Sequence, residues 1–371
     1  MKKSLHIVSF DIPFPANYGG VIDVFYKIKA LSELGIDITL HCFEYGDRQR
    51  RQELEFYCKE VYYYPRRKLV FEFWLPYIVS SRKNSQLLSN LLLDENPILF
   101  EALHSCYYLD HPSLSKRNKM VRMHNIEHDY YAQLAQSETN IARRFYYWYE
   151  SKVLKSFENI VLKAQTIWGI SSKDCKDLTV QFGEKVFLLP AFHGNDNVRS
   201  KIGSGPYCFY HGKLSVAENH LAAMYLVKEV FSKTNHVLKI AGDGVKPELR
   251  EAISLQPNIE LVENIGPEEI TGLIENAHIN VLVTFQPTGI KLKLVNVLYN
   301  GRFLLVNSSM VSGSGLEKAC IIEDEPEKMA LQIDALMEKE FTEQDIEWRK
   351  QLLGKQFDVL LNASKIIQHL N

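Results

Sequence analysis

Short apolar runs alternate with longer segments of helical periodicity from one end of this chain to the other. Such alternation is typical of β-α-β units, in which helices connect the parallel strands of a sheet. We expect a first series of strands near residues 5–10, 37–43, 61–65, 97–103, 119–124, 166–171 and 185–190. A second series is expected near residues 207–211, 236–241, 258–263, 278–285, 302–306 and 320–323. The pattern predicts an α/β protein with helices between the strands, including a long one over about residues 140–164.

The alternation breaks between the two series of strands. Residues 191–206 are rich in turn-forming residues and poor in apolar ones, and they end in Gly-Ser-Gly-Pro. We therefore expect two Rossmann-like, doubly wound domains over residues 1–190 and 207–371, joined by a linker at 191–206 and facing each other across a cleft. Ligands of such sheets bind beyond the carboxyl ends of the strands.

A phosphate site is indicated at residues 287–296, which follow the apolar run 280–285. Gly289 marks a turn, and Ile290 and Leu294 begin the apolar face of a helix. Lys291 and Lys293 fall in the first turns of that helix, where positive charge is unfavourable unless an anion is bound. Exposed main-chain N–H groups at a helix start also bind anions.

The Gly19-Gly20 pair follows the first strand and precedes a helix expected over residues 21–34. A glycine pair at a helix start lets a ligand approach the backbone closely and leaves N–H groups open to an anion. A tight turn that needs positive φ explains the pair equally well. Both interpretations stay open on the sequence alone.

Lys213 lies between the strand at 207–211 and a helix that we expect Ser215 and Glu218 to open as a capping box. A lysine at the carboxyl end of a strand suits an anionic ligand, although a surface lysine in a loop is the alternative. Gly242 and Gly244 resemble half of a G-x-G-x-x-G fingerprint, but Pro247 stands near the third glycine position. This departure argues against a dinucleotide-binding dehydrogenase.

His124 closes the fifth expected strand, and Glu127 and His128 follow it. Polar residues at this end of a strand point toward the expected ligand site. His124 is either a hydrogen-bonded structural residue or a site residue that contacts a sugar hydroxyl or a phosphate, or moves a proton. The spacing does not match the H-E-x-x-H zinc pattern, which argues against a metal site. Glu101 and His104 form a weaker pair of the same kind.

Composition narrows the class of protein. The chain has 371 residues, of which 46% are hydrophobic and 24% charged, as is ordinary for a soluble globular protein. The net charge of −2 argues against a nucleic-acid-binding protein. Residues 48–83 carry nine basic and four acidic side chains. This segment is either a solvated face or a patch that meets an anionic membrane or a phosphorylated acceptor.

Cysteine spacing and hydropathy bear on the compartment. None of the six cysteines forms a C-x-x-C pair, which fits a reducing compartment without a zinc or redox motif. The apolar run after the first three residues is too short for a signal peptide, and no stretch is long enough to span a bilayer. We expect a cytoplasmic protein, with a peripheral contact at the inner face of the membrane if the basic segment binds anionic lipid.

Together these features resemble the GT-B glycosyltransferases, specifically the large retaining group called family 4 or group 1. The resemblance covers nearly the whole chain. In the first half it rests on the Gly19-Gly20 loop, on RMHNIEH at residues 122–128 and on WGIS at 168–171. In the second half it rests on HGKL at 211–214, IAGDG at 240–244 and the stretch 288–302. In that family the last helical segments, here residues 343–371, pack back onto the first domain.

The resemblance implies a nucleotide-diphospho-sugar donor, a UDP- or GDP-sugar, held mainly by the second domain without a required metal or other cofactor. Gly20 would face the donor phosphates, Lys213 would bind them, and His124 would contact the transferred sugar. The implied site comprises catalytic His124, Lys213 and Lys291; phosphate-binding Gly19, Gly20, Gly212, Lys213, Gly289, Lys291 and Lys293; nucleoside-binding Gly242, Asn264 and Asn296; and acceptor or sugar contacts Asn17, Glu101, His104 and Asn125.

Two positions depart from the family pattern. The second phosphate-binding lysine, a few residues after Lys213, is absent, and Glu218 and Asn219 occupy that neighbourhood. The paired glutamates of the family correspond here to Thr288 and Asn296, and the Asn296 amide can still hydrogen-bond ribose hydroxyls. The two lysines of the 287–296 segment would restore the missing positive charge.

These features predict a hexosyltransferase-type enzyme that moves a sugar, with retained anomeric configuration, onto a glycan or lipid-linked acceptor in surface polysaccharide synthesis. Lysines and backbone N–H groups aimed at the leaving diphosphate would stabilise the transition state more than the ground state. Two alternatives stay open: a nucleotide-sugar 2-epimerase of the same fold, and a catalytically inactive nucleotide-sugar-binding relative. No nucleic-acid partner is expected.

Overall fold

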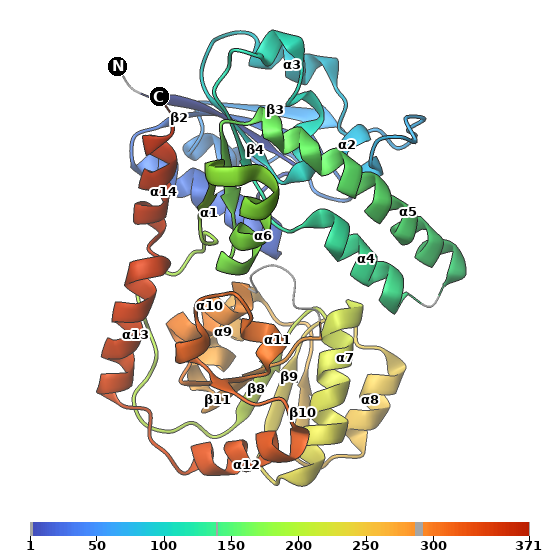
Figure 1. Ribbon diagram of the computed structural model, residues 1–371. Coiled ribbons are helices and arrows are strands. Elements are labelled where there is room, and N and C mark those ends of the chain that lie inside the picture. The colour runs from blue at the N-terminus through green and yellow to red at the C-terminus, as the bar shows by residue number, and fades with distance from the viewer. Residues whose placement is uncertain (1–2, 139, 286–291, 371) are drawn as a thin grey trace. The chain divides into compact units, whose positions relative to one another are not determined.

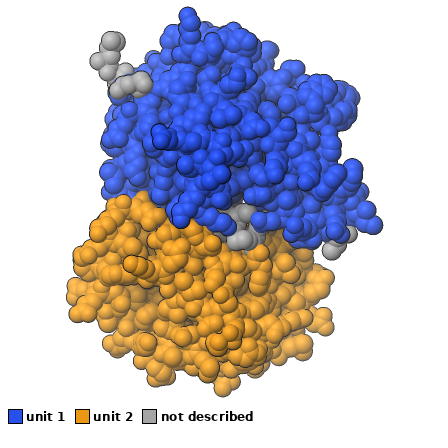
Figure 2. All heavy atoms as spheres, viewed as in Figure 1, with its two compact units in different colours: residues 1–194, 357–371 blue, residues 195–356 orange. Residues whose placement is uncertain are grey.

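The computed structural model describes residues 3–138, 140–285 and 292–370, which form two compact units (Figures 1 and 2). Unit 1 comprises Met1–Gly194 and Phe357–Asn371, and unit 2 comprises Asn195–Gln356. Each unit is built on one sheet of parallel strands with helices packed against it. The predicted α/β class with two doubly wound sheets is confirmed.

Unit 1 holds a seven-stranded sheet in the order β3-β2-β1-β4-β5-β6-β7. Its strands are β1 Ser4–Ser9, β2 Asp37–Glu44, β3 Glu60–Pro65, β4 Ile98–Glu101, β5 Lys119–Arg122, β6 Thr166–Gly169 and β7 Val186–Leu188. Its helices are α1 Gly19–Glu33, α2 Tyr77–Ser80, α3 Ser85–Leu91, α4 Glu127–Ser137, α5 Ile141–Phe157, α6 Ser172–Phe182 and α14 Val359–Gln368. The chain leaves β1 toward β2 and β3 and later returns to the other side of β1 as β4, so the strand order reverses between β1 and β4.

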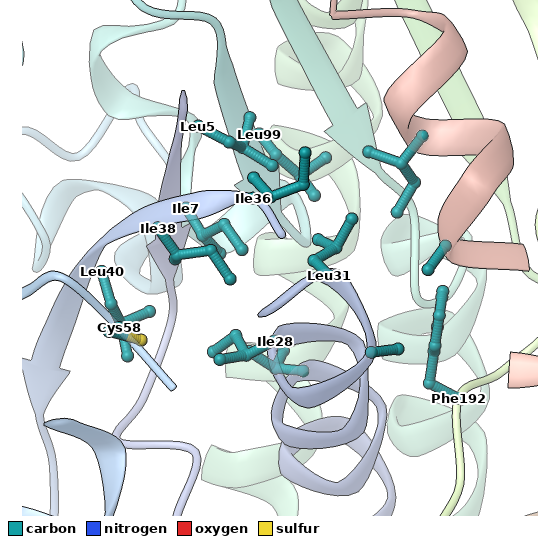
Figure 3. Close-up of a cluster of buried hydrophobic side chains, with 14 of the residues drawn as sticks. Leu5, Ile7, Ile28, Leu31, Ile36, Ile38, Leu40, Cys58, Leu99 and Phe192 are labelled. Carbon is teal, nitrogen blue, oxygen red and sulfur yellow. The ribbon is translucent and has the colours of Figure 1, made fainter. Parts of the chain in front are cut away.

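Both faces of this sheet are buried, which explains the continuous apolar runs of its strands. Leu5 and Ile7 of β1 belong to one buried cluster, whereas Val8 belongs to a second one. Successive side chains of a strand point to opposite faces, so a single strand supplies both clusters. The first cluster lies under α1 and α14, which pack side by side, and Figure 3 shows part of it. Those labelled there are Leu5, Ile7, Ile28, Leu31, Ile36, Ile38, Leu40, Cys58, Leu99 and Phe192.

Unit 2 holds a six-stranded parallel sheet in the order β10-β9-β8-β11-β12-β13, so the order reverses between β8 and β11. Its strands are β8 Cys208–His211, β9 Leu238–Ala241, β10 Ile259–Val262, β11 Ile279–Leu282, β12 Phe303–Val306 and β13 Ile321–Ile322. Its helices are α7 Ala217–Tyr225, α8 Pro247–Ser254, α9 Pro267–Asn276, α10 Leu292–Asn300, α11 Ser308–Val311, α12 Pro326–Met337 and α13 Glu343–Gln356.

The predicted strands are confirmed in every case, each with ends within three residues of those expected. The long helix expected over 140–164 ends earlier, because α5 stops at Phe157 and a 3₁₀ helix, Glu158–Lys163, completes the segment. The predicted capping box was wrong. Helix α7 begins at Ala217, and its N-cap residue Val216 makes no side-chain cap. The Glu218 carboxylate instead accepts a hydrogen bond from the hydroxyl of Thr284, which lies two residues beyond β11.

Unit 1 ends at residue 194 and unit 2 begins at residue 195. No separate linker of the length expected at 191–206 lies between them in the described part of the chain. Phe192 is buried in unit 1, and its backbone N–H donates to Asp23 at 2.8 Å. Ser200 is buried in unit 2, where its hydroxyl donates to Gly301 at 2.6 Å. Buried contacts therefore fix both ends of this segment, each within a different unit.

The carboxyl-terminal helices also divide between the units. Arg349 of α13 is buried in unit 2, where its guanidinium donates to the backbone oxygens of Gly301 and Arg302 at 2.6 Å each. Helix α14 packs against α1 and belongs to unit 1. The second domain was expected over residues 207–371. Its last fifteen residues, 357–371, belong to unit 1 instead.

Within the described residues, none of the helices combines the length and the apolar character that crossing a membrane requires. All six cysteines are free thiols.

Candidate active site

The strand order of unit 1 reverses between β1 and β4, and polar residues gather at the carboxyl ends of these strands. Asp11 follows β1, Glu101 ends β4, and His124 lies two residues beyond β5. Because the carboxyl ends of parallel strands share one edge of the sheet, side chains far apart in sequence meet there. This edge carries the candidate site of unit 1.

A buried ionic cluster underlies this edge. The Lys27 ammonium of α1 donates to Asp23 at 2.9 Å and to the two Glu101 oxygens at 2.7 and 2.8 Å. The Arg122 guanidinium donates to both Asp23 oxygens, at 3.1 Å to Oδ1 and 3.3 Å to Oδ2. All four side chains are at most 1% exposed, and their charges balance.

Both buried carboxyls, Asp23 and Glu101, have lowered pKa values. Burial alone would raise the pKa of Asp23, but Arg122 and Lys27 outweigh it and hold that pKa far below its usual range. The pKa of Glu101 is also lowered, because Lys27 and the hydrogen bond from His124 overcome burial. Both carboxyls are therefore ionised at neutral pH.

The cluster orients His124. Its Nε2 lies 2.9 Å from Glu101 Oε2, and because an ionised carboxylate only accepts, Nε2 carries the proton. The edge of the Phe10 ring packs on the imidazole at 5.5 Å between centroids. His124 is thus held in one orientation, with 8% of its surface exposed.

Asp23, Glu101 and His124 have ligand atoms within 4.8 Å of one another, a spacing that a metal ion could bridge. The same oxygens, however, accept hydrogen bonds from Lys27 and Arg122. Two protein cations already compensate the two carboxylates, so this group does not fit a metal.

The alternative metal set of His124, Glu127 and His128 does not form one group of ligands in the structure. His128 Nδ1 pairs with Glu158 at 2.6 Å, which raises the pKa of His128. Burial, with the Glu158 charge second, raises the pKa of Glu127 to about 8. Each of the three side chains therefore has a different partner or environment.

The Gly19-Gly20 pair opens α1, and neither glycine has positive φ, so a tight turn of that kind does not explain it. A Cβ at Gly20 would lie 2.7 Å from the Phe10 ring, so close packing against this ring explains the glycine. Asn17 nearby accepts a hydrogen bond from Arg48 at 2.8 Å. These residues keep the backbone before α1 close to the end of β1.

The remaining residues predicted for unit 1 lie beside His124. The Asn125 side chain hydrogen-bonds to Glu127. The His104 ring packs on Phe10 at 5.6 Å between centroids. Burial, and after it the Arg82 charge, hold the pKa of His104 well below its usual value, so this ring is neutral. Glu101, His104, Asn125 and His124 thus share one neighbourhood.

Unit 2 has a corresponding site where two glycine loops pack together at the ends of β8 and β9. A Cβ at Gly242, whose φ is +155°, would lie 1.9 Å from the Gly212 oxygen. At Gly244, with φ +74°, a Cβ would lie 2.6 Å from Ser215. The Leu214 N–H donates to Asp243 O at 2.8 Å and joins the loops. Only glycine permits this approach of one backbone to the other.

Asn219 of α7 links two of the predicted phosphate-binding lysines. Its Nδ2 donates to the backbone oxygen of Lys213 at 3.1 Å, and its Oδ1 accepts from Lys293 Nζ at 2.8 Å. Lys293 Nζ also lies 5.3 Å from the centroid of the Tyr210 ring. The sequence places Lys213 and Lys293 eighty residues apart, and the fold brings both to the end of β8.

Two carboxylates lie near these lysines, and each accepts a hydrogen bond from a neighbouring group. The Lys213 side chain is exposed and makes no ion pair within the described part of the chain. Glu218 is bound to Thr284, and Asp243 accepts from the Asn264 N–H at 3.1 Å. Burial, and after it the Lys293 charge, lower the pKa of His211 to about 3, so His211 is neutral. His211 therefore adds no charge to this edge of the sheet.

The predicted nucleoside-binding residues occupy two places in unit 2. Asn264 follows β10 with φ +57° beside Gly242 and Asp243. Asn296 lies in α10, where Asn300 Nδ2 donates to its Oδ1 at 3.0 Å. This bond leaves the Asn296 amide N–H₂ group as the donor to any ligand. Gly289 and Lys291 lie outside the described residues, as does Thr288.

The sequence analysis missed the buried cluster under His124 and the role of Asn219. One signal was present for the cluster, because Asp23 and Lys27 stand four residues apart on the face of α1 that also carries Val24, Ile28 and Leu31. Charges on an apolar stripe indicate buried partners. No signal identified Asn219, whose two partners come from distant segments.

No protein-family model matches this chain. A curated relative from Klebsiella pneumoniae, described as an uncharacterized 44.6 kDa protein in the cps region, is 25% identical over 383 residues. That match covers 98% of this chain and 95% of the relative.

Solved structures match over nearly the entire chain. Anabaena HepE in complex with UDP and glucose has a TM-score of 0.68 at 10% identity, covering 99% of both chains. Staphylococcus aureus TarM in complex with UDP has a TM-score of 0.67 at 12% identity over the full length of both. Sucrose-phosphate synthase from Thermosynechococcus elongatus has a TM-score of 0.66 at 12% identity, covering 99% and 98%. The fold is therefore that of the GT-B glycosyltransferases.

Proposed function

We propose that this protein is a retaining, family 4-like glycosyltransferase that uses a UDP- or GDP-sugar. The observation that carries the proposal is that Asn219 binds both the Lys293 ammonium and the Lys213 backbone oxygen at the end of β8. An ammonium group beside closely packed glycine loops suits a diphosphate. Complexes of the structural neighbours HepE with UDP-glucose and TarM with UDP support a nucleotide-sugar donor.

The proposed chemistry follows from the charge that develops when the anomeric C–O bond breaks. Negative charge grows on the departing diphosphate, and positive charge grows on the sugar. Lys213 and Lys293 stabilise the diphosphate, together with Lys291 as expected from the sequence, and they do so most strongly in the transition state. In unit 1, His124 contacts the transferred sugar through its Nδ1 side, and Glu101 positions His124.

The acceptor is proposed to be a glycan or a lipid-linked saccharide of a surface polysaccharide. The curated relative from the cps region supports this biological setting. We also propose that unit 1 contacts an anionic membrane. A group of exposed apolar side chains, the aromatic surface, supports this contact. It comprises Leu69, Phe71, Phe73 and Trp74 before α2 and Ile141, Phe145 and Trp148 on α5.

The two parts of the aromatic surface lie together, because the Tyr149 hydroxyl of α5 donates to Phe73 O at 2.8 Å. Trp74 is 74% exposed and Ile141 84%, although large apolar side chains in contiguous groups are rarely left in water. Arg143 and Arg144 are exposed on the same helix. Aromatic rings beside basic residues are typical of a protein surface at a bilayer interface.

A thermal-shift screen across nucleoside diphosphates tests the donor proposal first, since a ligand that binds only the folded state raises the Tm. UDP or GDP should raise it, whereas the corresponding nucleosides should not. Donor and candidate acceptors are then incubated together to measure transfer, and donor alone to detect epimerisation. Absence of any nucleotide effect would overturn the proposal. Tight binding without transfer to any acceptor would favour a non-catalytic binding protein, which the unusual Asn296 also permits.

A further inference from the structure

Unit 1 contains a cavity of about 340 Å³ beside His104. It is lined by six aromatic side chains, Phe10, Tyr18, Tyr45, Tyr77, Tyr131 and Tyr146. Its lining also includes two arginines, Arg66 and Arg82. The six rings provide flat faces on which a ligand can stack, and the two arginines provide positively charged hydrogen-bond donors.

Arg82 is a buried cation whose hydrogen-bond partners are backbone oxygens. It is 3% exposed, and its Nε donates to Phe10 O at 2.9 Å while its Nη1 donates to Ile78 O. Neither partner carries charge, and none of the described carboxylates pairs with this guanidinium. Burial, with the Arg66 charge second, lowers the pKa of Arg82 to about 9. A cation held in this way is costly unless an anion joins it.

Arg66 presents a second guanidinium to the same cavity. Its Cζ lies 4.3 Å from the Tyr45 ring centroid and 5.1 Å from that of Tyr77. Its Nε donates to Ser81 Oγ at 2.8 Å. Stacking on the two rings fixes the plane of the guanidinium, and no ion pair involves it within the described ranges. Its Nη donors therefore suit a further acceptor in that plane.

The lining offers little to neutralise these two cations. Asp11 is the carboxylate of the lining, but it accepts from Tyr18 Oη at 2.6 Å and from the Ile12 N–H at 2.8 Å. Its nearest cation is Arg48, at 3.7 Å. His104 contributes no charge, since burial and Arg82 lower its pKa well below neutrality. The cavity therefore keeps an excess of positive charge.

We propose that this cavity binds a phosphate group of the acceptor, with Arg66 and Arg82 on the phosphate and the tyrosine rings stacked on the sugar or prenyl group that carries it. Guanidinium groups match phosphate oxygens with paired hydrogen bonds, and rings without charge cover the neighbouring apolar faces. This inference rests on the proposed transferase function and names the chemistry of its second substrate. A neutral glycan acceptor would leave both cations uncompensated.

Calorimetric titration of the full chain tests the inference, in the presence of saturating UDP or GDP so that the donor site is filled. The probes are glucose 1-phosphate, methyl α-glucoside as its uncharged counterpart, and farnesyl phosphate. We expect the two phosphates to bind and the glucoside not to bind. Tighter binding of farnesyl phosphate would assign the phosphate to a lipid, and tighter binding of glucose 1-phosphate to a soluble sugar phosphate.

Arg66→Gln should weaken phosphate binding about tenfold, because it removes one charge-assisted contact. Arg67→Gln is the matched control, since Arg67 pairs with Glu72 at 3.2 Å and does not line the cavity. Equal binding of phosphate probe and glucoside, no binding of either phosphate, or equal losses in the two variants would overturn the inference. Nucleotide binding by Arg66→Gln is measured in parallel. If nucleotide binding persists, the variant is folded and the donor site is intact. A loss of phosphate binding alone then concerns the acceptor cavity and not the proposed donor site.

Discussion

Lys293 Nζ donates to Asn219 Oδ1 at 2.8 Å, so an ammonium from α10 stands near the place where the resemblance to family 4 glycosyltransferases led us to expect a second phosphate-binding lysine. Asn219 cannot supply that charge, but its amide oxygen holds a lysine that comes from elsewhere in the sequence. The positive charge is thus present near the end of β8, although a different segment supplies it.

Lys213→Ala should lower transferase activity by about 10²–10³-fold, because an interaction with the leaving diphosphate is lost in the transition state. The Lys213 side chain is exposed, so the Tm of the free protein should not change. Lys228→Ala, which removes another exposed lysine of unit 2, is the control. Turnover of the Lys213 variant near that of the control would contradict the assigned role.

Asn219→Asp should weaken nucleoside diphosphate binding about tenfold, because the new carboxylate would pair with Lys293 and repel the phosphates. Asn276→Asp is a close control. Lys201 donates to Asn276 Oδ1 at the same 2.8 Å, away from the β8 loop. Dissociation constants measured by calorimetry decide the matter, and equal affinities in the two variants would refute this role for Asn219.

Glu101→Gln should lower the free energy of unfolding of unit 1 by about 3–5 kcal/mol, since Lys27 then lacks one of its two buried carboxylates. The acid dependence should weaken as well. The folded-state pKa values of Asp23 and Glu101 are lowered, so their stabilisation is present above the unfolded pKa near 4 and disappears as pH falls below it. Denaturant titrations between pH 3 and pH 7 measure both effects, with exposed Glu95→Gln as the control.

Glu127→Gln should stabilise the protein at alkaline pH. Burial raises the folded pKa of Glu127 to about 8, whereas the unfolded value is about 4.3. Between these values the unfolded state releases a proton that the folded state keeps, so stability falls as pH rises, by about 1.4 kcal/mol per pH unit. The Tm of the variant should exceed that of the wild type at pH 8 and approach it at pH 4. A difference independent of pH would contradict the buried, protonated carboxyl.

Trp74→Ser combined with Phe71→Ser should reduce sedimentation with vesicles that contain anionic lipid by about tenfold or more. Each exposed aromatic side chain adds apolar area to the bilayer contact. Leu255→Ser is the control, because Leu255 of unit 2 is 75% exposed and lies outside the aromatic surface. Two outcomes would contradict this membrane contact. In one, the wild type binds neutral and anionic vesicles equally; in the other, the double variant binds anionic vesicles as well as the wild type does. A monodisperse dimer that dissociates in the double variant would assign the surface to a second copy of the chain.

The sequence predicted the elements of the fold almost completely, because buried parallel strands are short and apolar while the connecting helices have a different period. Local capping was harder to predict. Ser215 and Glu218 have the spacing of a capping box, but Glu218 bonds to Thr284 of another segment. A tertiary hydrogen bond replaced the local one, and spacing within a single segment does not reveal such competition.

The sequence by itself also determined which residues stand at strand ends, and therefore that His124, Lys213 and the glycine loops lie at the carboxyl edges of the sheets. Only the tertiary structure decided which distant side chains meet them. Lys27 and Glu101 are 74 residues apart and Lys293 and Asn219 are 74 apart. Hydrophobic periodicity is a local property and fixes the elements, whereas charge pairing depends on contacts that form only when those elements pack.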